Sequence, residues 1–239
     1  MPEVAPRIHA VGSEIVNCYL VEDAGRVAIV DAGVPAYWAD LPAALAAMGR
    51  TLADVRAIVM THGHDDHRGF AERARGAGIG SRVHQLDADL ARKAVPNPSK
   101  FAGSIRPGPL VRFLWFAFRH GYFRTPGLGE VETFDDGAVL DVPGAPRVIH
   151  VPGHTPGSAA FHFPGHDALF VGDALNTWSF ATGWQGPQLS PLNADRGQAL
   201  ESLARLEAIE ATFVLPGHGA PWRQGARDAV KEARRISVR

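Results

Sequence analysis

Short apolar runs alternate with helix-like stretches along most of the chain. The runs 18–22 and 26–33 flank an Asp-Ala-Gly turn, a pattern typical of a β-hairpin. Alanine- and leucine-rich spacing predicts a helix over 35–50, and a stripe of leucines predicts another over 195–209. Further strands are predicted at 55–64, the start of 81–95, 146–163, 167–175 and 212–219, and further helices at the end of 81–95 and at 226–236.

Two parts of this pattern resemble each other. "VAIVDAG", a helix and "AIVMTHGH" are echoed by "ALFVGDAL", a helix and "FVLPGHG". Two such halves predict an α/β (α+β) fold, in which two sheets pack face to face with helices outside and polar residues gather at strand ends along one edge. We expect one domain over residues 1–239. Residues 96–130 break the rhythm and form an insert.

The stretch "THGHDDHRG" (61–69) concentrates polar side chains directly after a strand. His62, His64, Asp66 and His67 fill the pattern His-x-His-x-Asp-His. Burying four adjacent polar groups without partners would be costly, whereas imidazole and carboxylate groups bind zinc, iron or manganese. A tight loop cannot aim all four at one ion, so the first two histidines are expected to bind one ion and the Asp-His pair a second.

Further ligands are predicted where later strands end. His154 lies in "VPGHTPGS", Asp173 follows an apolar strand in "FVGDAL", and His218 follows another in "VLPGHG". The candidate set therefore has five histidines and two carboxylates. Asp65 falls at a variable position of the pattern and is interpreted as a solvated or backbone-bonding loop residue.

Composition narrows the cellular context. The 239 residues are 46% hydrophobic and carry a formal net charge of −1, so no global charge attracts nucleic acid. Cys18 is the single cysteine, which rules out an intrachain disulfide. No apolar run approaches the ~20 residues of a membrane span, and the start "MPEVAPRIHAVG" lacks a signal pattern. We expect a cytoplasmic protein without stable membrane insertion.

Taken in order, "NCYLVE…VDAG", "THGHDDH", "PGHTPGS", "GDAL" and "PGHG" resemble the metallo-β-lactamase superfamily over most of the chain. The resemblance implies a four-layer αβ/βα sandwich of two mixed sheets flanked by helices, with a metal cleft at one edge. It assigns His62, His64 and His154 to one metal and Asp66, His67 and His218 to another, with Asp173 bridging both. It also implies that Asp31, in "VDAG", supports the ligands by hydrogen bonding, although a turn or cap role is an equal alternative.

The resemblance also predicts the chemistry. Two divalent ions, Zn²⁺ first with iron or manganese as alternatives, would hold a bridging hydroxide that cleaves an ester, thioester or lactone bond of a small molecule. Asp66 is expected to orient this nucleophile or carry a proton. One rival is a mononuclear iron enzyme resembling persulfide dioxygenases, and another is a non-catalytic metal-binding scaffold.

Individual subfamilies differ around Asp173. Class B β-lactamases have Cys or Ser there, which argues against antibiotic hydrolysis, whereas glyoxalase II-type thioesterases and acyl-homoserine lactonases keep Asp. The better-known lactonases place a tyrosine shortly after it, where this chain has Asn176 and Trp178. Glyoxalase II-type enzymes typically extend well beyond the last histidine, whereas 21 residues follow His218 here, so glutathione binding by such an extension is not expected.

The insert offers the best substrate clue. Residues 100–127 contain one Lys, four Arg and no acidic residue, with an aromatic middle. We weigh a lid over the metal cleft against an ordinary buried helix or a homodimer contact through residues 100–125, with a membrane-surface role as a further option. A second long loop is expected over 177–193. The candidate substrate-binding residues are Phe116, Asn176, Trp178 and Trp184.

Overall fold

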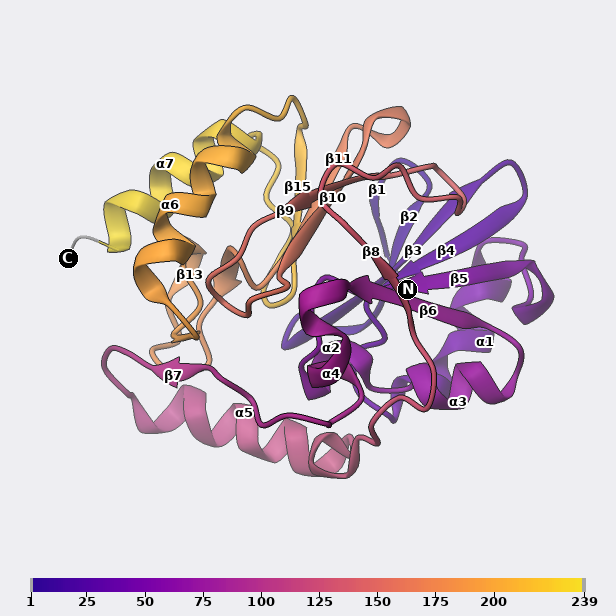
Figure 1. The fold of residues 1–239 in the computed structure, drawn as a ribbon, viewed down its shortest axis with the longest axis horizontal. Helices are drawn as coiled ribbons and strands as arrows, with labels where there is room; N and C mark the ends of the chain where they lie inside the picture. Colours follow the sequence, from indigo (N-terminus) through magenta and orange to yellow (C-terminus); the bar gives the residue numbers. More distant parts are fainter. Residues whose placement is uncertain (1, 238–239) are drawn as a thin grey trace.

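A computed structural model describes residues 2–237, and the first half of the chain builds a seven-stranded sheet (Figure 1). Its order is β1-β2-β3-β4-β5-β6-β8, antiparallel up to β4 and parallel from there on. The strands are β1 (Glu3–Ala5), β2 (Ile8–Ser13), β3 (Val16–Asp23), β4 (Arg26–Val30), β5 (Val55–Val59), β6 (Gly80–His84) and β8 (Glu132–Phe134). The predicted hairpin joins β3 to β4, where Ala24 and Gly25 both have positive φ, as a tight two-residue hairpin turn requires.

The other strands build a four-stranded sheet and two hydrogen-bonded strand pairs. The sheet order is β15-β11-β10-β9, and β12 pairs with β13 and β14 with β7. The strands are β7 (Lys100–Phe101), β9 (Arg147–His150), β10 (Ala159–Phe163), β11 (Ala168–Gly172), β12 (Asn176–Trp178), β13 (Gln185–Gln188), β14 (Leu192–Asn193) and β15 (Phe213–Pro216). The segment 177–193 is therefore not the long loop that was predicted, because backbone pairing gives it strands.

Seven α-helices lie among residues 2–237. They are α1 (Tyr37–Ala47), α2 (Asp65–Arg68), α3 (Ala71–Gly76), α4 (Ala88–Ala91), α5 (Pro107–Arg119), α6 (Arg196–Glu207) and α7 (Ala226–Ser237). Figure 1 shows α6 and α7 together on one side of the molecule, α1 and α3 beside the larger sheet, and α5 along the lower edge. Within the described part of the chain, no helix has the length and apolar character needed to cross a bilayer.

Three apolar cores separate four layers. Along β3, Cys18 and Leu20 face a core shared with α1, while Tyr19 and Val21 face a core shared with the second sheet. This two-residue alternation, apolar on both sides, is what a strand covered on both faces requires. A third core joins the second sheet to α6 and α7 through residues such as Leu203. The predicted four-layer αβ/βα sandwich is confirmed.

The internal repeat corresponds to two parallel strand–helix–strand units. β4 and β5 pair in parallel across α1, and β11 and β15 pair in parallel across α6. The carboxyl ends of β4, β5, β11 and β15 bear the polar residues predicted there. These four strand ends and the loop after β9 carry the candidate site.

Candidate metal centre

Seven buried polar side chains meet at these strand ends. Each is at most 7% exposed. They are His62 and His64 after β5, Asp66 and His67 in α2, His154 after β9, Asp173 after β11 and His218 after β15. We call this set the seven-residue cluster. All residues proposed as ligands from the sequence therefore lie together, although the binding of an ion to each stays a prediction.

The cluster divides into groups with the geometry of metal sites. Potential ligand atoms within 4.8 Å of one another form the groups His62/His64/His154, His62/His67/Asp173 and Asp66/His67/His218. The first and third have the membership of the two ligand sets implied by the resemblance. Asp173 lies between them, because its oxygens are 3.3 Å from His218 Nε2 and 3.6 Å from His154 Nε2.

Hydrogen bonds on the outer side fix the tautomers of His154 and His64. His154 Nδ1 lies 2.6 Å from the Leu192 carbonyl oxygen, and His64 Nε2 lies 2.9 Å from Asn97 Oδ1, which also accepts from the Ser99 backbone N–H. Since these oxygens accept, both ring nitrogens donate. His154 Nε2 and His64 Nδ1 then carry no proton, and their lone pairs face each other with the two nitrogens 3.0 Å apart.

His62 follows the same rule. The Thr61 hydroxyl donates to Asp31 Oδ2 at 2.9 Å, so its oxygen accepts from His62 Nδ1 at 3.1 Å. His62 Nε2 then carries a third lone pair, and this nitrogen lies 3.1–3.2 Å from the inner nitrogens of His64 and His154. Three mutually repelling lone pairs this close are stable around a cation, because tetrahedral ligands at ~2.0–2.1 Å from zinc stand about 3.3 Å apart.

The second group is arranged in the same way. His67 Nδ1 donates to Asp31 Oδ2 at 2.8 Å, and His218 Nδ1 donates to the Ile15 carbonyl oxygen. His67 Nε2 and Asp173 Oδ1 are buried without a hydrogen-bond partner within residues 2–237, although they lie 3.5 Å apart. Buried polar atoms are rarely left unpaired, so the cluster has the donor set and the unsatisfied atoms that suit divalent cations.

A glycine leaves room for these side chains. A Cβ atom at Gly217 would stand 2.3 Å from Asp173 Oδ1 and 2.6 Å from His67 Cε1. Any larger residue there would displace two members of the cluster. The Pro-Gly-His order at the end of β15 therefore helps to build the site in two ways. It supplies His218, and Gly217 leaves the space that Asp173 and His67 occupy.

Charge within the cluster separates the histidines into two kinds. Burial lowers the pKa of His62, His64 and His154, and neighbouring imidazoles lower the pKa of the first two further. Burial also lowers the pKa of His218, but Asp173 and Asp66 outweigh it and raise that pKa to about 9. Asp31, Asp173 and Asp66 likewise hold the pKa of His67 well above its ordinary value. The carboxylates thus favour positive charge at this spot, which a bound cation supplies.

Asp31 is hydrogen-bonded to the ligand loop and to one histidine of the cluster. It is 3% exposed, and its carboxylate accepts hydrogen bonds from the Thr61 backbone N–H at 2.7 Å, from the Thr61 hydroxyl and from His67 Nδ1. Its backbone has φ of 59°, a left-handed conformation that Asp and Asn tolerate better than most residues. Asp31 therefore fixes both the start of the ligand loop and the orientation of one candidate ligand.

Asp87 also supports the site, although no sequence motif indicated this role. It is completely buried, and its carboxylate accepts from the Gly63 N–H at 2.9 Å, the Thr155 hydroxyl at 2.7 Å and the Gly157 N–H at 2.7 Å. These donors belong to the loop of His62 and His64 and to the loop of His154. Asp87 thus ties together the two loops that build the first group.

Replacement of Asp87 by alanine is expected to destabilise the protein by about 3–5 kcal/mol, because three buried donors lose their acceptor. The matched control is Asp89→Ala. Asp89 is exposed, and its Oδ1 lies 3.5 Å from a guanidinium nitrogen of the exposed Arg92. This substitution should change the free energy of unfolding by no more than about 0.5 kcal/mol. Denaturant unfolding measures both variants. Equal stability of the two would contradict the structural role given to Asp87.

Asp65 is not the solvated loop residue that was expected. It begins α2 and forms an ion pair with Arg68, which is 2% exposed. The Arg68 guanidinium also donates to the carbonyl oxygens of Gly63 at 3.0 Å and Leu90 at 2.7 Å. A buried guanidinium needs a negative partner, so Asp65 neutralises the arginine that holds the ligand loop against α4.

The four predicted substrate residues fall in different environments. Asn176 is 1% exposed and accepts from the His218 N–H through Oδ1 at 3.3 Å, so it positions a candidate ligand. Trp178 is 8% exposed, lies in the first core and stands under the Arg112 guanidinium. Trp184 is 43% exposed on the surface. Phe116 packs in the first core and stacks on His120, which places it away from any described cavity wall.

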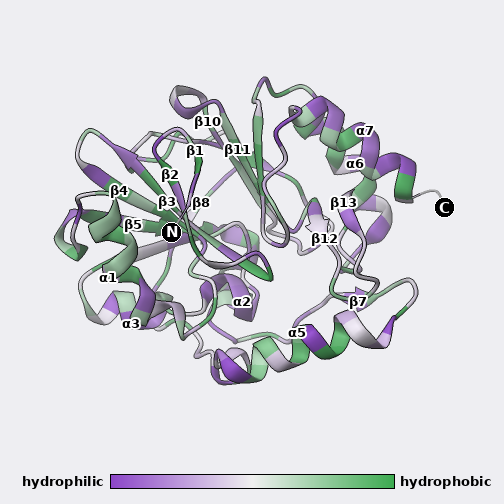
Figure 2. Cartoon of the chain, turned by 180° about the vertical axis from the view of Figure 1, so that it is seen from behind, coloured by the Kyte–Doolittle hydropathy of each residue, from purple (hydrophilic) through white to green (hydrophobic). Residues whose placement is uncertain are grey.

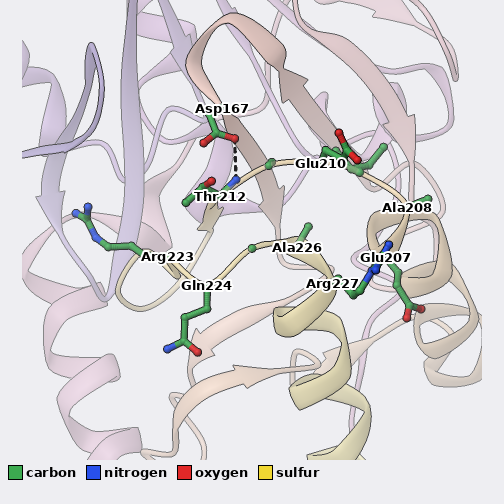
Figure 3. Close-up of a pocket in the computed structure, with 12 residues that line it drawn as sticks. Asp167, Glu207, Ala208, Glu210, Thr212, Arg223, Gln224, Ala226 and Arg227 are labelled. Carbon is green, nitrogen blue, oxygen red and sulfur yellow. Dashed lines mark hydrogen bonds between the residues drawn. The ribbon is translucent and has the colours of Figure 1, made fainter.

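One cavity adjoins the cluster. Its volume is about 470 Å³, and His64, Asn97, Lys93, Tyr122 and Arg68 are among the residues that line it. Both ends of the insert contribute, through Asn97 on one side and Tyr122 on the other. A second cavity of about 620 Å³ lies between the end of α6 and the start of α7, with polar side chains such as Asp167 and Arg223 around it and no member of the cluster (Figure 3). Of these two cavities, the first is therefore the one that borders the cluster.

Comparison with curated proteins gives two informative relatives. The chain is 33% identical over 203 residues to a hydroxyacylglutathione hydrolase of Fuscovulum blasticum, covering 84% of this chain and 61% of that protein. It is 25% identical over 237 residues to the uncharacterized protein YobT of Bacillus subtilis strain 168, covering 92% of this chain and 91% of that one. The chain thus spans less than two thirds of the length of the hydrolase.

Solved structures resemble the whole chain. A metallo-beta-lactamase family protein from Thermus thermophilus superposes with a TM-score of 0.71 at 25% identity, covering 99% of this chain and 81% of that one. The protein TTHA1623, solved in a di-iron-bound form, superposes with a TM-score of 0.64 at 26% identity, covering 92% of this chain and 96% of that one.

The family model described as "Metallo-beta-lactamase superfamily" matches residues 11–218. That range begins in β2 and ends at His218, so it contains every residue of the cluster. With four layers, a buried His/Asp cluster at the strand ends and this match, the chain belongs to the metallo-beta-lactamase superfamily.

Proposed function

We propose that the protein is a dinuclear metal hydrolase that cleaves a thioester, ester or lactone bond of a small molecule. The observation that carries the proposal is the convergence of five imidazole rings and two carboxylates, in two groups linked by Asp173. The similarity to a protein named hydroxyacylglutathione hydrolase favours thioesters among these bonds.

Two divalent ions bound there would supply a hydroxide near neutral pH and polarise the substrate carbonyl. Asp66 would orient the attacking water and accept its proton. It is 7% exposed, and its Oδ2 lies 3.5 Å from His218 Nε2. A carboxylate held within the cluster and shielded from bulk water keeps a fixed direction toward the reacting atoms.

The cavity beside His64 would receive the acyl part of the substrate. Tyr122 lines it, and Asp66, with burial adding, raises the pKa of the Tyr122 phenol, so the hydroxyl stays a neutral donor. Lys93 stands on the same wall and donates to the Thr125 carbonyl oxygen at 2.6 Å. A neutral donor and a cation suit an acyl group that carries a hydroxyl or carboxylate.

A substrate panel tests the proposal. Thioesters, lactones, aryl esters, phosphodiesters and a β-lactam are assayed with the zinc, manganese and iron forms, and His64→Ala serves as the inactive reference. We expect a thioester to give a kcat/KM at least about tenfold above the other classes. Hydrolysis of no substrate above the level of His64→Ala, in every metal form, would overturn the proposal.

A further inference from the structure

Helix α5 is apolar on the side that faces solvent. Val111, Leu114, Trp115 and Phe118 are spaced i, i+3, i+4 and i+7, so they share one face, and they are 62%, 44%, 63% and 68% exposed. The opposite side of the helix is already packed, because Phe116 and Ala117 are buried. We call the four exposed residues the outer face of α5.

This face belongs to a concentration of exposed apolar side chains. Of the eleven large apolar residues that are exposed within residues 2–237, seven lie between positions 101 and 123. They are Phe101, Ile105, Val111, Leu114, Trp115, Phe118 and Phe123. Scattered exposed apolar residues are ordinary, but such a gathering on one segment marks an interaction surface. Figures 1 and 2 place α5 at the lower edge of the molecule, accessible from outside.

The same segment carries unneutralised positive charge. Residues 100–127 contain Lys100, Arg106, Arg112, Arg119 and Arg124 and no Asp or Glu. Among the ion pairs within 4.0 Å in the described chain, none involves any of these five. Two of the arginines lie beside indole rings instead, including Arg119 at 5.8 Å from the Trp115 ring.

Charge selects among the possible occupants. A second copy docked through the same segment would present five basic side chains to five basic side chains, and residues 100–127 contain no acidic residue to pair with them, which is unfavourable. A bilayer with anionic phospholipids offers the complement, since phosphate groups pair with arginine while the aliphatic and aromatic side chains enter the interfacial region. Tryptophan beside arginine on an apolar helix face is typical of that interface.

We propose that the outer face of α5 docks the protein reversibly on the surface of an anionic phospholipid bilayer. The helix lies in the plane of the interface and does not span the membrane. This proposal does not depend on the hydrolase activity, because none of the four outer-face residues lines the cavity beside His64.

Vesicle sedimentation tests the proposal with the whole protein. Vesicles of phosphatidylcholine with about one third phosphatidylserine are compared with vesicles of phosphatidylcholine alone. We expect binding at least about tenfold stronger to the anionic vesicles, weakened by about 0.5 M salt. The double variant Trp115→Ser/Phe118→Ser should lose about tenfold in affinity for them, and Arg119→Gln/Arg124→Gln should lose most of the preference for anionic lipid.

Val139→Ser is the matched control, because Val139 is 66% exposed but lies outside the insert; it should bind like the unmodified protein. Thermal unfolding confirms that each variant is folded. Two results would overturn the proposal. One is equal vesicle binding by the double variant and the control. The other is absence of vesicle binding by the unmodified protein. If light scattering then shows a dimer that Trp115→Ser/Phe118→Ser dissociates, the outer face of α5 is a dimer contact; if it shows a monomer, the face has neither role.

Discussion

Replacement of His154 by alanine is expected to lower kcat/KM for the best substrate on the order of a thousandfold. His154 supplies one of three inner nitrogens that lie 3.0–3.2 Å apart, and it comes from a different loop than the other two. Without it, His62 and His64 alone cannot complete the first group. Elemental analysis of the purified variant should show that about one metal ion per chain is lost.

His150→Ala is the matched control for this prediction. His150 ends β9 four residues before His154, but its Nε2 bonds the Pro156 carbonyl oxygen and its ring stacks on His84 at 4.2 Å. It touches no member of the cluster, so kcat/KM and metal content should be nearly unchanged. The assignment of His154 fails if both variants retain full metal content and activity.

Replacement of Asp31 by asparagine is expected to lower metal affinity by about 10–100-fold while leaving the fold intact. Asparagine tolerates the left-handed backbone at this position and can still accept from the Thr61 N–H through its carbonyl oxygen. Its amide group, however, would face the N–H of His67 Nδ1, so two donors meet. Relief requires His67 to change its tautomer, which removes the lone pair from Nε2.

Asp31→Ala separates this effect from stability. Alanine leaves the Thr61 N–H, the Thr61 hydroxyl and His67 Nδ1 without an acceptor in the core, and we expect a loss of about 3 kcal/mol of unfolding free energy. Chelator competition measures metal affinity, and denaturant unfolding measures stability. An asparagine variant that binds metal as tightly as the unmodified protein would show that Asp31 does not act through His67.

The strand-end residues were predictable because chemistry and periodicity agree there. His62, Asp173 and His218 each follow an apolar run that ends abruptly in a polar residue, and parallel strands bring their carboxyl ends to one edge. The order of the motifs then gave the family and the four layers. Asp31, which follows β4, was identified through the family resemblance of the "VDAG" motif.

Other features depend on contacts that no local pattern encodes. Asp87 sits in "HQLDADL", where it resembles an ordinary helix-start residue, and its role arises from Gly63 and Thr155, 24 and 68 positions away. The ion pair of Asp65 with Arg68 follows from the burial of the arginine, which the local sequence does not indicate.

The insert shows the same limit. Its aromatic middle was compatible with a lid, a buried helix or a dimer contact, and the sequence does not indicate which of its side chains the core covers. The structure buries Phe116 and exposes Trp115 and Phe118. The residue predicted to bind substrate is therefore the one that packs in the core.

Metal stoichiometry combined with activity tests whether the protein is a dinuclear hydrolase. The protein is purified without chelator, its metals are counted, and thioester hydrolysis is measured as zinc is titrated into the chelator-treated protein. We predict about two divalent ions per chain, with hydrolysis rising until the second ion binds. One iron per chain with thiol-dependent oxygen uptake and no hydrolysis would contradict the assignment as a dinuclear hydrolase.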